Sequence, residues 1–298
     1  MTETISAVVL SGMTALTGLT GLDDSPFERA AIGLALALVV AGAARAARAL
    51  DWGGGAAAVA CGTVCAAAGW MWAVTLIGYF LVSSLVSRVG RSSKERRTAS
   101  VVAKGGTRDA MQVLANGGVY CAAAVATLLW PGQLWEWAGL AALAASAADT
   151  WATEIGLLAG WTPVSIVGRT SVQYGMSGGV TLPGVAGALV GAGTVAAIAL
   201  AAGFPRGAAF AAIGSGWAGA MIDSLLGATI QQRRRCDSCA VDTELSIHVC
   251  GSNTRHIAGI RWVDNDVINL LATLAGFILS AALYLVAVGL VVRSAGAR

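Results

Sequence analysis

The chain has 298 residues, of which 56% are hydrophobic and only 12% are charged, and its mean hydropathy is +0.72. A soluble domain would carry about a quarter charged residues, so this composition excludes an ordinary soluble globular protein. The long Ala/Leu/Gly runs also lack the alternation of an outer-membrane barrel. The sequence therefore predicts an all-α protein, a polytopic transmembrane helical bundle.

About nine spans are expected within a single integral membrane domain, residues 1–298. The first apolar segment, 4–22, is diluted by Ser, Thr and Gly, and it lacks the basic flank of a cleaved signal peptide. A second span is expected at 28–48, and residues 55–88 are expected to form two short helices that turn near Gly69 and Trp70. The remaining expected spans are 110–130, 134–157, 179–203, 207–230 and 265–292.

The basic residues are unevenly distributed between the connecting segments. Fifteen of the nineteen Lys and Arg residues fall in segments 45–51, 88–109, 159–178 and 231–263. With nine spans these segments share one side, which the positive-inside rule makes cytoplasmic, while Trp130, Trp135 and Trp137 mark the opposite interface. We therefore expect a plasma-membrane protein whose N-terminus, basic loop 88–109 and functional site all lie on the cytoplasmic side.

Three acids, Asp149, Glu154 and Asp223, lie inside otherwise apolar helices. A charge at that depth is costly unless it is paired or hydrated, so such residues are functional-site candidates. Each acid has an alternative explanation, because it could pair with a buried arginine or cap a helix. Other polar residues fall within about 12 Å of the same boundary, counted at the helical rise. These residues are Asn116, Asn265, Asp266 and Asn269. Their common depth favours a cavity that opens to the cytoplasm.

Carboxylates surrounded by basic residues indicate a divalent cation and a phosphorylated ligand. Mg²⁺ typically takes one or two carboxylates together with phosphate oxygens and water, so the three acids are its expected ligands. Lys104 and Arg108, which lie nearest the next helix, and Arg169 are the candidate phosphate partners. The alternative is an ordinary basic loop whose charges only orient the chain.

A glycine-rich stretch opens the expected span at 179 and offers a second anion site. Ser177, Gly178, Gly179 and Thr181 precede the apolar run, and the N-terminus of a helix binds anions through free backbone N–H groups. Glycines are also common in membrane helices, so the motif alone is weak. Its place on the basic side favours the anion site.

The loop 231–264 contains Cys236-x-x-Cys239 followed by His248-x-Cys250. One histidine and three thiolates can form a tetrahedral zinc site. A disulfide is disfavoured in the cytoplasm, so a structural Zn²⁺ in a zinc knuckle and free thiols both remain open. Cys61, Cys65 and Cys121 lie in apolar helices and are expected to be small core residues.

Five strings occur in order along most of the chain, from about 28 to 290. They are Gln112-Val-Leu-Ala-Asn116-Gly-Gly118, Asp149-Thr-x-x-Thr-Glu154-Ile-Gly156, Ser177-Gly-Gly-Val-Thr181, Asp223-Ser-Leu-Leu-Gly-Ala-Thr229 and Asp264-Asn-Asp266-x-x-Asn269. With them the chain resembles the integral membrane family of phytyl-phosphate kinase and transmembrane protein 19, domain of unknown function 92. More remotely it resembles dolichol and phytol kinases and the lipid cytidylyltransferases.

The resemblance implies a membrane-embedded lipid kinase that uses ATP or CTP to convert a prenyl (phytyl-like) monophosphate to the diphosphate. The three acids would hold Mg²⁺, the basic side chains would neutralise phosphates, and the asparagines would orient the ligands. A general base is not needed, because a phosphate monoester oxygen is already anionic at pH 7. The expected partners are an isoprenoid monophosphate, a nucleotide and membrane lipid, with no nucleic acid, and an oligomer is left open. A CTP-dependent lipid nucleotidyltransferase and a cation-coupled transporter are the alternatives, although no inverted repeat is found.

Overall fold

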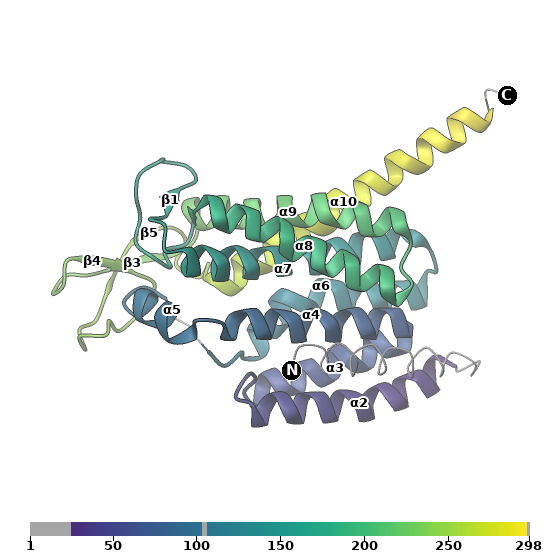
Figure 1. Cartoon of the computed structure of the whole chain (residues 1–298), viewed down its shortest axis with the longest axis horizontal. Helices are drawn as coiled ribbons and strands as arrows, with labels where there is room; N and C mark the ends of the chain where they lie inside the picture. The colour runs from purple at the N-terminus through teal and green to yellow at the C-terminus, as the bar shows by residue number, and fades with distance from the viewer. Residues whose placement is uncertain (1–24, 103–105, 297–298) are drawn as a thin grey trace.

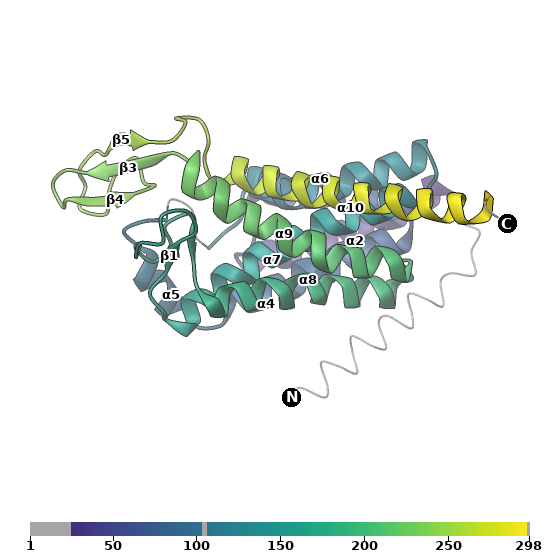
Figure 2. The same ribbon diagram turned by 90° about the horizontal axis from the view of Figure 1, so that it is seen from above.

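The computed structural model describes residues 25–102 and 106–296. The expected helical bundle is confirmed, and most of its helices run along the long axis of the molecule (Figures 1 and 2). The helices are α2 (Pro26–Ala46), α3 (Trp52–Ala68), α4 (Trp70–Arg88), α5 (Arg91–Thr98), α6 (Ala110–Leu129), α7 (Gln133–Ala159), α8 (Leu182–Ala202), α9 (Arg206–Thr229) and α10 (Asn265–Gly296).

Eight of the nine expected spans correspond to helices, and the first, 4–22, lies outside the described residues. Six helices are long and apolar enough to cross a membrane: α2, α4, α6, α8, α9 and α10. The helix α3 is shorter, with 17 residues, and α7 carries Glu136 in addition to two of the intramembrane acids. The number of spans and the side of the N-terminus stay predictions.

The helix ends follow local sequence signals. Ser25 and Asp109 each accept a hydrogen bond from a backbone N–H three residues on and form capping boxes, with Glu28 and Gln112 respectively. The expected break between α3 and α4 lies at Gly69, whose φ of 148° is outside the range that other residues readily adopt. These signals determine where the helices α2 and α6 begin and where α3 ends and α4 begins.

The structure also has five short strands, which the all-α expectation did not include. Four of them lie in the basic segments 159–178 and 231–263, and β2 lies at the start of the span expected at 179–203. A two-stranded sheet pairs β1 (Val164–Ser165) with β2 (Gly179–Val180), and a three-stranded antiparallel sheet has the order β4-β3-β5. Its strands are β3 (Arg233–Cys236), β4 (Val241–Thr243) and β5 (Arg255–Ala258). Both sheets and α5 gather at the same end of the bundle (Figure 1).

The helix α7 lies at the centre of the bundle and packs against α4, α6, α8, α9 and α10. Every residue from Ala138 to Ala148 is buried. The neighbouring helices approach closely through small residues, as is common in membranes: a Cβ at Gly191 of α8 would lie 2.7 Å from the carbonyl oxygen of Ala147. Asp149 follows this buried run directly, so the packing of α7 fixes where its carboxylate lies.

Candidate functional site

A cavity of about 490 Å³ lies at the end of the bundle that carries the strands. Its walls come from α4, α5, α7, the glycine-rich turn before α8, α9 and the start of α10. Among the predicted site residues, the structure brings these to its lining: Arg108, Asp149, Glu154, Ser177, Gly178, Gly179, Thr181, Asp223, Asn265 and Asp266. Segments far apart in the sequence therefore meet at one polar cavity, which we call the polar cavity below.

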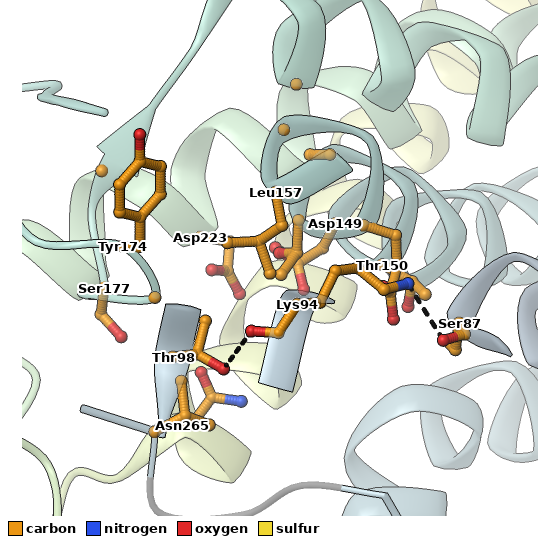
Figure 3. A pocket seen from close by; sticks show the side chains of 18 of the residues that line it. Ser87, Lys94, Thr98, Asp149, Thr150, Leu157, Tyr174, Ser177, Asp223 and Asn265 are labelled. Carbon is orange, nitrogen blue, oxygen red and sulfur yellow. Dashed lines mark hydrogen bonds and ion pairs between the residues drawn. The ribbon is translucent and has the colours of Figure 1, made fainter. Parts of the chain in front are cut away.

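Asp149 of α7 and Asp223 of α9 face one another in this cavity (Figure 3), and their carboxyl groups are close enough to interact electrostatically. The Oδ2 atom of Asp223 is buried and has no hydrogen-bond partner among the described residues. Neither carboxylate forms an ion pair with a Lys, Arg or His side chain among the residues that the structure describes. Two carboxylates side by side repel one another unless a proton or a cation lies between them, so the pair offers hard oxygen ligands of the kind Mg²⁺ prefers.

Glu154 differs from the other two acids because it has a cationic partner. The Lys94 side chain, which is only 6% exposed, forms an ion pair with the Oε2 atom of Glu154. The Lys94 ammonium also donates to the carbonyl oxygens of Ser87 at 3.0 Å and Val86 at 3.3 Å. From the sequence, pairing with a buried arginine is an alternative explanation of each acid. Glu154 is paired in this way, but with a buried lysine. The pair joins α5 to α7 and leaves one oxygen of Glu154 for a ligand.

Arg108 lies at the edge of the polar cavity, held by the backbone on both sides. Its N–H donates to the carbonyl oxygen of Ala49, and its own carbonyl accepts from the N–H of Asp51, both at 3.0 Å. Its guanidinium donates to Ser84 Oγ at 3.3 Å and pairs with no carboxylate in the residues the structure describes. Three further arginines also line the cavity: Arg48, Arg88 and Arg91. The cavity thus combines acids with a basic rim.

The glycine-rich turn before α8 also lines the cavity, and its glycines have a packing role. Gly178 has a φ of +80°, and a Cβ there would lie 2.5 Å from the Cβ of Ala228 in α9. Thr181 caps α8 by accepting a hydrogen bond from the Gly184 N–H at 3.1 Å. The turn is therefore shaped by its contact with α9, and it presents backbone to the cavity at the same time.

Three predicted site residues that the structure describes do not line the polar cavity. Arg169 is exposed in the loop after β1 and does not line the cavity. Asn116 donates to the Gln112 carbonyl and accepts from Ser146 Oγ, both at 2.8 Å, within the bundle. Asn269 is buried in α10 and lines neither described cavity. Lys104 lies outside the described residues.

Sequence reasoning missed Lys94 and Glu244 as lining residues. Glu244 follows β4 and accepts a hydrogen bond from Ser177 Oγ at 2.5 Å. Burial raises the pKa of Glu244 above its usual value, although the hydrogen bond from Ser177 opposes this shift. Neither residue lies in an apolar segment. The signal that identified Asp149, Glu154 and Asp223, a charged side chain inside an apolar run, was therefore absent for both.

A second, apolar cavity of about 400 Å³ lies between α2, α3, α4 and α6. Its lining is almost entirely aliphatic and aromatic, and includes Leu36, Val40, Leu76 and Phe80. Its polar lining residues include Arg108, Gln112 and Thr150, which also line the polar cavity. The two cavities, polar and apolar, therefore share one wall.

The predicted metal-binding residues Cys236, Cys239, His248 and Cys250 come together beside the three-stranded sheet, where Cys236 ends β3, with one ligand atom of each within 4.8 Å of the others. Hydrogen bonds from Ser252 and then His248 lower the pKa of the Cys250 thiol to about 5. Thiolate is the form that binds metals. Cys61, Cys65 and Cys121 are buried in the bundle, as expected.

Residues 35–277 match the family model described as Integral membrane protein DUF92. The chain is 27% identical over 281 residues to Protein PGR of Arabidopsis thaliana, covering 85% of this chain and 95% of that protein. It is 25% identical over 217 residues to an uncharacterized membrane protein of Methanocaldococcus jannaschii, covering 72% of this chain and 77% of that one. An uncharacterized membrane protein of Synechocystis sp. is 29% identical over 202 residues, covering 61% of this chain and 72% of its own length.

No solved structure matches the chain. The five ordered motifs all fall within the matched residues, and the resemblance that they indicated is confirmed. The chain belongs to the DUF92 family of integral membrane proteins.

Proposed function

We propose that this protein is a membrane-embedded kinase that transfers a phosphate from ATP or CTP to a prenyl, phytyl-like monophosphate. The observation that carries the proposal is the wall shared by the two cavities, at Arg108, Gln112 and Thr150. A site for an amphiphile needs an apolar compartment for the chain and a polar one for the head group. In this protein the polar and the apolar cavity meet at the guanidinium of Arg108.

The apolar cavity fits a hydrocarbon chain. It lies between α2, α3, α4 and α6, and away from the shared wall its lining is almost entirely apolar. A chain placed there would bring its head group to Arg108, whose planar guanidinium suits phosphate oxygens. Because Arg108 forms no ion pair with a described residue, an incoming phosphate would not have to displace a carboxylate.

The polar cavity fits Mg²⁺ and a nucleotide. Asp149 and Asp223 supply adjacent hard oxygen atoms, including the unpartnered Oδ2 of Asp223, and would hold the ion. Glu154 would contribute through its remaining oxygen or through water. When bound, Mg²⁺ neutralises phosphate charge and orients the transferred group. The proposed Mg²⁺ ligands therefore line the same cavity as the arginines that would bind the nucleotide phosphates, Arg48, Arg88 and Arg91.

The transfer needs positioning and charge neutralisation more than proton chemistry. An anionic oxygen of the lipid monophosphate forms a bond to the γ-phosphorus, and the bond to the bridging oxygen breaks, releasing nucleoside diphosphate. Arg108 would hold the attacking phosphate, and the backbone of the turn at Gly178 would approach the nucleotide. Asn265 and Asp266 at the start of α10 also line this cavity. We further propose that this end faces the cytoplasm, where the nucleotide is found.

The test is product analysis with purified protein, Mg²⁺, ATP or CTP, and a panel of prenyl monophosphates. The proposal predicts lipid diphosphate together with nucleoside diphosphate. Release of pyrophosphate would instead indicate nucleotidyl transfer to the lipid, and no transfer to any lipid by folded protein would contradict both reactions. Glu136→Gln is the matched control for acid-to-amide changes, because Glu136 lies on α7 but does not line the cavity.

A further inference from the structure

We propose that Cys236, Cys239, His248 and Cys250 bind one Zn²⁺ ion, and that this ion holds the three-stranded sheet in place and, through it, Glu244 in the wall of the polar cavity. The ion would lie outside the reaction. The proposal therefore does not depend on the kinase activity and can fail separately from it.

Two distances between ligand atoms are close to those of a tetrahedral site. Zinc–sulfur bonds of about 2.3 Å place two sulfur ligands about 3.8 Å apart. The Sγ atoms of Cys236 and Cys250 are 3.6 Å apart, and His248 Nδ1 lies 3.2 Å from Cys250 Sγ. A disulfide would need the two sulfurs at about 2.05 Å. The side chains are therefore spaced for a shared ion and not for a covalent bond.

The backbone around the ligands is shaped to bring them together. Cys236 ends β3 and pairs with Val241 of β4, and the turn between them contains Ala240 at a φ of 55°. The second turn is closed by the Gly251 N–H donating to the His248 carbonyl at 2.8 Å. The strands have only three or four residues each. Small sheets of this kind are marginal without another source of stability, and a bound ion supplies it.

The sheet in turn holds two parts of the polar cavity. The Glu244 N–H donates to the carbonyl oxygen of Val101, just after α5, at 2.9 Å. The Glu244 carboxylate accepts from Ser177 in the glycine-rich turn at 2.5 Å. The segment after α5 and this turn are thus both fixed by the residue that follows β4. Loss of the ion would loosen β4 and release both contacts.

Four protein ligands leave no open position on the ion, which is the arrangement of structural zinc. Two of the ligands, Cys239 and Cys250, are exposed, so an ion can reach the site without unfolding of the helical bundle. Three thiolates would more than neutralise the double positive charge of the ion.

The first test is metal analysis of the full-length, tag-free protein purified in detergent. We expect about one Zn²⁺ per chain, and little in Cys239→Ser or Cys250→Ser. His256→Ala is the matched control for His248→Ala, because His256 contacts the Gly259 carbonyl at 3.0 Å and is outside the cluster. Folded wild-type protein without zinc, whether it has three reactive thiols or a Cys236–Cys250 disulfide, would overturn the proposal. So would full zinc content in both cysteine variants.

The second test measures the link to the cavity by amide hydrogen exchange, before and after removal of zinc with a chelator. We expect faster exchange at 98–102 and 175–179 and unchanged exchange in the buried part of α7. If zinc leaves and these two segments keep their protection, the ion does not hold the wall. If α7 also loses protection, the effect is general unfolding and the proposed coupling is wrong.

Discussion

The carboxyl groups of Asp149 and Asp223 lie close enough to interact electrostatically across the boundary between α7 and α9. Asp149 directly follows a run of eleven buried residues in α7, Ala138–Ala148. Two acids in contact inside an apolar bundle destabilise the protein unless they share a cation or a proton. The proposed Mg²⁺ site depends most on this pair, because the two adjacent carboxylates would supply the oxygen ligands of the ion.

Asp149→Asn and Asp223→Asn should each lower the rate of phosphate transfer by at least about 100-fold, the usual cost of losing a group that stabilises transition-state charge. Neither change should lower the melting temperature, because each one removes a repulsive contact. Steady-state rates and thermal unfolding in detergent measure the two effects. Retained activity in either variant, with Glu136→Gln also active, would remove that residue from the site.

Arg108→Ala should raise the KM for the lipid monophosphate by about tenfold or more, because a charge-assisted contact to phosphate is worth about 1.5–3 kcal/mol. Arg108→Lys should recover only part of the loss, since an ammonium lacks the planar fork. Arg169→Ala is the control: Arg169 is exposed and away from the cavity, so its loss should leave KM unchanged. A larger effect at Arg169 than at Arg108 would contradict the assignment.

Ala58→Phe should shorten the lipid chain that the protein accepts, because Ala58 lines the apolar cavity. We expect kcat/KM for a long-chain prenyl monophosphate to fall by about tenfold, while a short-chain substrate changes little. Ala60→Phe, on the same helix with its side chain exposed, provides the comparison. Equal losses for both chain lengths would show that the cavity does not hold the chain.

Lys94→Met should destabilise the protein by about 1–3 kcal/mol, because it leaves the partly buried Glu154 carboxylate without its cationic partner. Adding Glu154→Gln should recover much of that loss, since no uncompensated charge remains. A thermal-unfolding double-mutant cycle measures the coupling. If the two single changes simply add, the ion pair does not stabilise the contact between α5 and α7.

Glu244→Gln should change how stability depends on pH. Burial raises the pKa of Glu244 in the folded protein, so the folded state binds this proton more tightly than the unfolded state does. Ionisation of Glu244 therefore lowers the stability of the folded state. The loss begins as the pH rises above the pKa of Glu244 in the unfolded state, and it is complete once the pH exceeds the raised pKa in the folded state. The glutamine variant should match the wild type at low pH and be more stable at neutral pH, because its amide oxygen still accepts from Ser177. A wild type that is the more stable of the two at neutral pH would contradict this sign.

The helical bundle could be predicted from the sequence because its signals are local. Apolar runs fix the helices, Asp109 and Thr181 mark helix starts, and Gly69 marks a turn. Asp149 and Asp223 could be identified as site residues because an acid in an apolar run stands out against its neighbours. That they touch depends on how α7 and α9 pack, which no local pattern shows.

Other parts of the site depend on contacts between distant segments. In the sequence, nothing distinguishes Lys94 from the other basic residues of the loop 88–109. In the structure, its side chain is buried against Glu154. Glu244 reaches the cavity only because β4 pairs with β3 and packs beside Val101. Conversely, the charge of Arg169 fitted a phosphate partner, but its loop carries it into solvent. A side chain's charge is visible in the sequence, whereas its direction is set by tertiary packing.

The most direct test of the central claim follows label from the γ- and the α-phosphate of the nucleotide separately, with Mg²⁺ and a prenyl monophosphate. Wild-type protein and the Asp149→Asn variant would be assayed side by side at equal folded concentration. The account predicts that γ-label enters the lipid, that α-label stays in the released nucleoside diphosphate, and that Asp149→Asn transfers neither. Absence of γ-label from every lipid tested with folded wild-type protein, or equal transfer by the variant, would contradict it.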